Sequence, residues 1–241
     1  MGEARDLERK KTRFFCIDRN TGEVLWEDQS FGEDWWIGIE AVTGNRMFLH
    51  GFAVPDLPAH QKIIAVELST GEQLWENPDL SFETFVEEKI LASQGAHGAK
   101  TFFFLNPASG AILEGGASRT ISEATRPTLV AVDALFPEMI QEHDEARLPF
   151  RSLLASRKCT GPFEMAQVHG YTILSFCVAR DEDAAARRQE IEVLKTDGYS
   201  SEFRDVINET TSVFTPESFF TQGSMLYYVK QRSILTGVHL S

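Results

Sequence analysis

Apolar and polar residues alternate along the chain in a pattern that repeats around three glycines. An apolar strand leads into a polar turn that ends in Ser-Gly or Thr-Gly, and a second short strand follows. Three segments share this pattern: residues 14–27, 63–76 and 102–115, with glycines at Gly22, Gly71 and Gly110. Glycine adopts the positive φ that a tight turn needs, and β-branched and aromatic residues flank it as in a hairpin. The pattern predicts three equivalent hairpins, with a weaker copy at 193–198.

A further strand pair precedes most of these hairpins, so that each hairpin belongs to a group of four strands. Four-stranded repeats of roughly 40–50 residues are typical of β-propeller blades. We therefore expect an all-β fold, a small β-propeller of about five four-stranded blades, or alternatively an incomplete propeller with another blade count. The expected blades are 33–76, 82–115, about 118–158, 160–208, and 215–241 joined to 14–27. The third is the least regular, because residues 136–158 have partly helical spacing.

Ring closure follows from the two ends of this pattern. The hairpin at 14–27 has no strand pair before it, and the last pair, 218–229, is followed only by a short tail. Placing residues 14–27 beside the last pair would complete the fifth blade and hide both free sheet edges. We expect a single propeller domain over 14–241, with a charged N-terminal tail at 1–13.

The turn of the first hairpin carries a signature that resembles the repeat of quinoprotein-type (PQQ-type) β-propellers. Its residues are Asp18, Thr21, Gly22, Glu23 and Trp26. The second copy keeps Gly71 and Trp75, and the third keeps Gly110 but has Glu114 where the tryptophan would stand. The resemblance implies a packing role, so we expect Trp26 and Trp75 to be equivalent residues buried between blades. The whole chain resembles a small bacterial family of unknown function built on such repeats.

The resemblance does not extend to quinone chemistry. Quinone-dependent dehydrogenases of this fold have a vicinal cysteine pair and a calcium site with a catalytic aspartate, whereas Cys16, Cys159 and Cys177 are far apart in the sequence. No Gly-x-Ser-x-Gly elbow or glycine-rich phosphate loop occurs. No two histidines or cysteines have the spacing of zinc ligands. We therefore predict no catalytic residue, no cofactor and no metal site.

Net charge narrows the range of partners. The chain carries a formal charge of -13 at pH 7, most of it within residues 14–115. A surface this acidic repels phosphate backbones and anionic lipid, so we expect neither nucleic acid nor a membrane as partner. Residues 1–13 lack the apolar core of a signal peptide, and three unpaired cysteines suit a reducing compartment. We therefore expect a cytoplasmic protein, whose acids serve either solubility or a cation-binding face.

Two adjacent tryptophans stand among acidic residues at the start of a predicted strand. Successive strand residues point to opposite faces, so one of the two rings faces the next blade or the ring interior. We expect a ligand site near the axis, lined by acids and rings from two blades: Asp34, Trp36, Glu40 and Glu164, with His50 as a further candidate. An aromatic plane beside carboxylates suits a small cationic or polyhydroxylated ligand. The alternative is packing between blades, with the acids exposed to solvent.

These features support three functional hypotheses. The leading one is a non-catalytic β-propeller module that binds a protein or a small ligand on one ring face. The second is an enzyme with a dispersed active site near the axis. The third is a structural partner in a complex that uses the acidic first half.

Overall fold

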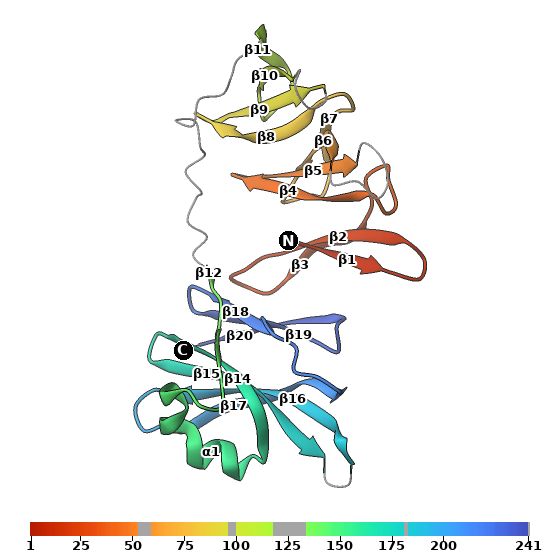
Figure 1. Ribbon diagram of the computed structural model, residues 1–241. Coiled ribbons are helices and arrows are strands. Elements are labelled where there is room, and N and C mark those ends of the chain that lie inside the picture. Colours follow the sequence, from red (N-terminus) through yellow and green to blue (C-terminus); the bar gives the residue numbers. More distant parts are fainter. Residues whose placement is uncertain (53–58, 96–99, 118–133, 181–182, 241) are drawn as a thin grey trace. The chain divides into compact units, whose positions relative to one another are not determined.

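The computed structural model describes residues 1–52, 59–95, 100–117, 134–180 and 183–240 (Figure 1). The chain divides into two compact units, Met1–Leu129 (unit 1) and Val130–Ser241 (unit 2). Both units are built almost entirely of antiparallel strands. The predicted all-β class is therefore confirmed.

Unit 1 contains three antiparallel sheets, and in each the neighbouring strands follow one another in the sequence. The first sheet has the strands β1 (Gly2–Asp6), β2 (Lys11–Ile17) and β3 (Val24–Gln29). The second has β4 (Ile37–Thr43), β5 (Arg46–Phe52), β6 (His60–Glu67) and β7 (Gln73–Asn77). The third has β8 (Ser81–Val86), β9 (Lys89–Gln94), β10 (Thr101–Leu105) and β11 (Ile112–Ala117).

The three repeat hairpins of the sequence are β2–β3, β6–β7 and β10–β11. Their turns have the same geometry, because each glycine has a φ between 69° and 75°. The glycine N–H also donates to the carbonyl four residues earlier in every turn, at 2.8 or 2.9 Å. Glycine is the residue that reaches this left-handed conformation at no steric cost, which explains its place in the repeat.

The tryptophans of the repeat pack onto the turn of the following sheet. The Trp26 Nε1–H donates to the carbonyl of Leu68 at 2.7 Å, and a Cβ on Gly71 would lie 2.9 Å from the indole. Trp75 stands in the same relation to Gly110, where a Cβ would lie 2.7 Å from the ring. Each glycine therefore makes the turn and also leaves room for the indole of the preceding hairpin.

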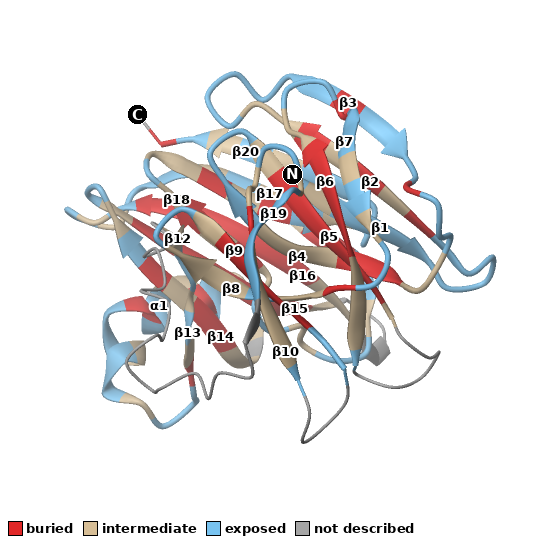
Figure 2. Ribbon diagram, turned by 90° about the horizontal axis from the view of Figure 1, so that it is seen from above, coloured by how far each residue is buried: buried red, intermediate tan, exposed pale blue. Residues whose placement is uncertain are grey.

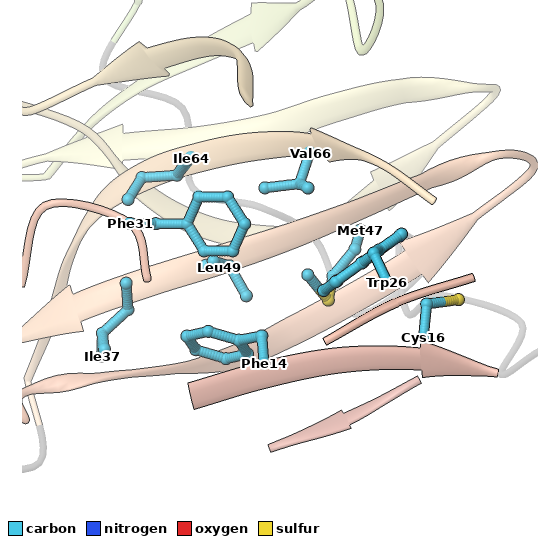
Figure 3. Packing of buried hydrophobic residues seen from close by; sticks show 9 residues of the cluster. All are labelled: Phe14, Cys16, Trp26, Phe31, Ile37, Met47, Leu49, Ile64 and Val66. Carbon is cyan, nitrogen blue, oxygen red and sulfur yellow. The ribbon is translucent and has the colours of Figure 1, made fainter. Parts of the chain in front are cut away.

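Two hydrophobic clusters lie on the two sides of the second sheet. On one side, Phe14 and Trp26 of the first sheet pack with Met47, Leu49 and Ile64 of β5 and β6 (Figure 3). The opposite face of the same strands packs against the third sheet through a second set of residues: Phe48, Ile63, Ala65, Leu80, Ile90, Ala92 and Leu105. Because both faces are covered, β5 is buried along most of its length and β6 along its second half (Figure 2). This explains the uninterrupted apolar runs 47–49 and 63–66.

Unit 2 contains two antiparallel sheets and a short helical segment. The five-stranded sheet has β13 (Glu138–Ile140), β14 (Cys159–Val168), β15 (Tyr171–Arg180), β16 (Asp183–Lys195) and β17 (Ser201–Thr211). The four-stranded sheet has β12 (Ala134–Leu135), β18 (Phe219–Gln222), β19 (Met225–Lys230) and β20 (Ile234–His239). A 3₁₀ helix, Glu145–Phe150, leads into α1 (Arg151–Ser156). Among the described residues, no helix has the length and apolar character needed to cross a bilayer.

The five-stranded sheet of unit 2 is also covered on both faces. One face packs on the four-stranded sheet, where Ile191 and Val193 join Phe219 and Tyr228 in a cluster. The other face carries the helical segment, with Phe150 and Leu154 packed in a cluster that contains Phe163, Leu174 and Phe176. Unit 2 therefore has its own cores, separate from those of unit 1.

The predicted closure of a propeller ring is wrong. The hairpin at 14–27 pairs with β1 rather than with the last strands, and β18 pairs with β12. The five sheets are all open. Strand β1 lies only a short turn away from β2, so pairing with it costs far less loop-closure entropy than pairing with strands some 200 residues later. Residues 1–13, expected to be a tail, supply β1 and the start of β2.

The expected third blade does not form a sheet of its own in the described part of the chain. Strand β13 joins β14 as an edge strand, and residues 145–156 are helical. The helical spacing of the apolar residues in this region is the physical reason, since it does not alternate as a strand requires. The strand expected at 128–132 lies outside the described residues.

Candidate functional site

Three strands of the second sheet of unit 1 bring an acid and two histidines together. Glu40 lies on β4, His50 on β5 and His60 on β6. Each residue offers one oxygen or nitrogen atom that could bind a metal, and these three atoms all lie within 4.8 Å of one another. We call this group the Glu40–His50–His60 cluster. Sequence analysis selected its first two members and missed the third.

Two β-bulges stand beside the cluster. The register of β4 against β5 shifts between Ile39 and Ala41, which leaves Glu40 as an extra residue on β4. The register of β6 against β5 shifts next to His50 and leaves Lys62 as the extra residue, with a φ of 72°. A bulge bends its strand and redirects nearby side chains. The bulges therefore account for the meeting of side chains from three strands.

One carboxylate oxygen lies against both imidazoles. The His60 Nδ1–H donates to Oε2 of Glu40 at 2.8 Å, and Nδ1 of His50 lies 2.9 Å from the same oxygen. The two rings are stacked, with their centroids 3.5 Å apart and their planes 6° from parallel. Both Nδ1 atoms and the carboxylate thus converge on one point.

The Nδ1 atom of His50 is buried and lacks a hydrogen bond in the part of the chain that the structure describes. The His50 side chain is only 10% exposed. Nδ1 lies 2.9 Å from the Glu40 oxygen, yet it has no hydrogen-bond partner among the described residues. Buried polar atoms are nearly always bonded, and an unsatisfied one costs about 1–3 kcal/mol. This atom is therefore the strongest sign of a ligand position in the cluster.

Aromatic rings form one wall of the cluster. Phe52 meets His50 and His60 edge-on, with centroids 5.1 and 5.3 Å away, and Trp36 lies 5.8 Å from Phe52. On another side His50 covers Gly38, where a Cβ would lie 3.1 Å from the imidazole. His50 is therefore held on two sides, whereas the side chain of His60 is 37% exposed.

A cation from the first sheet also reaches the region. Nη2 of Arg5 would lie 3.4 Å from a Cβ on Gly38, so the guanidinium is close to the ring of His50. Arg5 donates to the carbonyl of Ile37 at 2.6 Å and pairs with Glu3 at 2.9 Å. Glu3 therefore neutralises the positive charge of Arg5. The carboxylate of Glu40 is left to interact with the two imidazoles.

The ionisation of Glu40 follows from this environment. Burial raises the pKa of its carboxyl group, but the imidazoles of His50 and His60 outweigh burial and hold the pKa below its ordinary value. Glu40 is therefore a carboxylate at neutral pH and accepts hydrogen bonds only. Its charge favours a cation at the point where the two Nδ1 atoms converge.

The other predicted residues of unit 1 differ in their relation to the cluster. Trp36 borders it through Phe52, as described above. Asp34 does not join it in the described contacts: its side chain is 63% exposed and lies 3.6 Å from Nη1 of Arg13. The neighbouring indole, Trp35, lies under Lys10, whose Nζ is 4.6 Å from the ring centroid.

Glu164 belongs to unit 2 and serves that unit. It is buried on β14 and only 2% exposed. Oε2 accepts the backbone N–H of Ser218 at 3.1 Å and the Ser218 hydroxyl at 2.7 Å, while Oε1 accepts the N–H of Glu217. Both oxygens therefore hold the segment that leads into β18.

His60 was missed because the relevant proximity is between strands. It lies ten positions after His50, whereas short-range ligand motifs place histidines within a few residues of one another. The available signal was the pairing of β5 with β6, which sets Phe52 opposite His60. Aligning the two strands in this register would have placed both histidines on one face.

Comparison with known proteins gives one partial match. The model of a family described as a domain of unknown function (DUF4905) matches residues 1–75. The matched segment contains the first sheet, the complete Glu40–His50–His60 cluster and most of β7. No curated protein matches the chain.

Proposed function

We propose that this chain is a non-catalytic binding module and that its ligand is a cation held at the Glu40–His50–His60 cluster. The convergence of one carboxylate and two Nδ1 atoms on a single point carries the proposal. A buried carboxylate attracts positive charge, and the unsatisfied Nδ1 of His50 offers a lone pair or an N–H to the same position.

The surroundings of the cluster support a small ligand. Phe52 offers aromatic surface beside the two imidazoles, and Trp36 packs on Phe52. Aromatic surface favours cations. The side chain of His60 is 37% exposed, so solvent reaches the cluster at this residue. The proposed site lies beside the bulge of β4, near the end of β5 and the start of β6.

The repeats have a different role in this proposal. The packing of Trp26 on Gly71 and of Trp75 on Gly110 agrees with the resemblance to quinoprotein-type repeats. We propose that this packing stacks successive sheets of unit 1 and so holds β4, β5 and β6 in place. The repeat thus supports the site without contacting the ligand.

A panel of ligands tests the proposal. Thermal unfolding of wild type would be measured with a quaternary amine, a diamine, a neutral sugar, Ca²⁺ and Zn²⁺ in buffer free of chelators. Binding to the native state raises the melting temperature, so we expect a rise with at least one cation and none with the sugar. The Glu40→Gln variant should lose the rise, whereas Glu72→Gln, an exposed acid in a turn of the same unit, should keep it. No response of wild type to any cation, or an equal response of Glu40→Gln, would overturn the proposal.

A further inference from the structure

We propose that the Glu40–His50–His60 cluster takes a divalent transition-metal ion of the zinc class, coordinated by Nδ1 of both histidines and one oxygen of Glu40. This inference rests on the proposed function and names the class of its cation. It also assigns a site to a chain in which sequence spacing predicted no metal.

The donor set selects the metal. Two imidazole nitrogens and one carboxylate oxygen are typical ligands of Zn²⁺ and of neighbouring ions such as Co²⁺ and Ni²⁺. Ca²⁺ and Mg²⁺ prefer sites made of oxygen ligands. Three protein ligands leave at least one coordination position for water or another small ligand, because zinc usually binds four.

The unsatisfied Nδ1 of His50 is an independent observation that points to the same ion. This side chain is nine-tenths buried, and its Nδ1 faces the Glu40 oxygen without a hydrogen bond. A metal at the convergence point would coordinate that atom and remove the cost of its burial. The proposed ion thus accounts for a buried polar atom that has no hydrogen-bond partner among the described residues.

Coordination requires one ring to move. The two imidazole planes are nearly parallel and stacked, so no point within bonding distance of both rings lies in both planes, whereas a metal is best bound in the plane of each ring. His50 is confined by Gly38 and Phe52. His60 is the first residue of β6 and is partly exposed. We therefore expect His60 to turn out of the stack while His50 keeps its position.

Proton exchange balances the binding step. To bind the metal, Nδ1 of His60 must lose the proton that it donates to Glu40. In a neutral ring, Nε2 takes up a proton from solvent, so that the imidazole changes tautomer and keeps its charge. Where an imidazole is protonated, binding instead releases a proton to the buffer, so affinity falls as pH is lowered. Among the described residues, Arg5 also lies close to His50, and it pairs with Glu3.

The test uses the full chain without an affinity tag. Zn²⁺ binding would be measured by calorimetry, and Co²⁺ binding by the visible absorption of the bound ion. We expect one ion per chain, no comparable binding of Mg²⁺, and a loss of at least about tenfold in affinity in His60→Gln and Glu40→Gln. His143→Gln, which changes a histidine that is 87% exposed in unit 2, should bind as wild type does.

The outcomes separate this inference from the proposed function. His60→Gln is the principal variant because this partly exposed side chain can be replaced without opening a core, and its fold is checked by circular dichroism. If amines stabilise wild type but Zn²⁺ and Co²⁺ do not bind, the metal inference fails and the proposed function stands. Metal binding that survives both His60→Gln and Glu40→Gln would also refute the inference. If no cation binds at all, both proposals fall.

Discussion

At the scale of single residues, small differences in surroundings decide what each repeated residue does. Gly22, Gly71 and Gly110 have the same left-handed backbone, yet only the last two lie under an indole. The first turn has no sheet before it in the repeat, and a Cβ on Gly22 would meet nothing within 4 Å. Glycine is therefore required at the first turn only by the positive φ, and at the other two turns also by the space that the indole occupies.

Alanine substitutions separate these demands. Gly22→Ala places a side chain at positive φ and should cost about 1 kcal/mol. Gly71→Ala and Gly110→Ala add a contact of less than 3 Å with Trp26 or Trp75, so each should cost a further 1–3 kcal/mol or so from overpacking. Chemical denaturation followed by tryptophan fluorescence measures the difference. Equal destabilisation by all three substitutions would show that the indoles do not restrict the turns.

At the scale of elements, sequence patterns predicted what is local and missed what is not. The hairpins β2–β3, β6–β7 and β10–β11 were predictable, because each is specified by alternation and a glycine within 14 residues. The pairing of β12 with β18 was not, since it joins residues 134–135 to residues near 221. The cluster shows the same limit: Glu40 and His50 were selected from their own strands, whereas His60 depends on the register between strands.

An ion pair with a fully buried carboxylate links the end of helix α1 to the sheet of unit 2. Arg157, just after the helix, donates to both carboxylate oxygens of Glu192 on β16, at 2.7 and 3.2 Å. The Glu192 side chain is fully buried, while that of Arg157 is 29% exposed. Burial raises the pKa of Glu192, but the hydrogen bond and charge of Arg157, with further contributions from Ser201 and Arg204, hold it below its ordinary value.

Removing the arginine should therefore destabilise unit 2 in a pH-dependent way. Arg157→Ala leaves a buried carboxylate without its main partner and should cost about 3 kcal/mol at pH 7. In wild type the lowered pKa gives stability above the ordinary pKa of glutamate, and this stability is lost as pH falls through the folded value. In the variant the burial penalty disappears once Glu192 is protonated.

The difference in unfolding free energy between wild type and Arg157→Ala should thus shrink from pH 7 toward pH 4. Denaturant titrations at several pH values measure it. The control is Glu192→Gln, which leaves the partly exposed Arg157 able to reach water. Its difference from wild type should shrink by less, because it changes only through the lowered pKa of wild-type Glu192. A difference for Arg157→Ala that stays constant with pH would contradict the assignment.

At the scale of the whole molecule, the chain is two units with separate cores. Each of the four hydrophobic clusters is confined to one unit. The closed ring predicted from the repeat count would have been one cooperative domain, and the open sheets and local pairing of β1 with β2 remove the reason to expect it. Tryptophan and tyrosine also divide between the units: all four tryptophans lie in unit 1 and all four tyrosines in unit 2.

This division allows each unit to be followed in the intact chain. Tryptophan fluorescence reports the unfolding of unit 1, and the second-derivative absorbance of tyrosine reports that of unit 2. Because the clusters are separate, we expect Gly71→Ala to shift the fluorescence transition and Arg157→Ala to shift the tyrosine transition, each leaving the other within about 0.5 kcal/mol of wild type. If either substitution moved both transitions equally, the chain would unfold as a single cooperative unit. Adding Zn²⁺ extends the comparison, since an ion held by Glu40, His50 and His60 should raise the fluorescence transition alone.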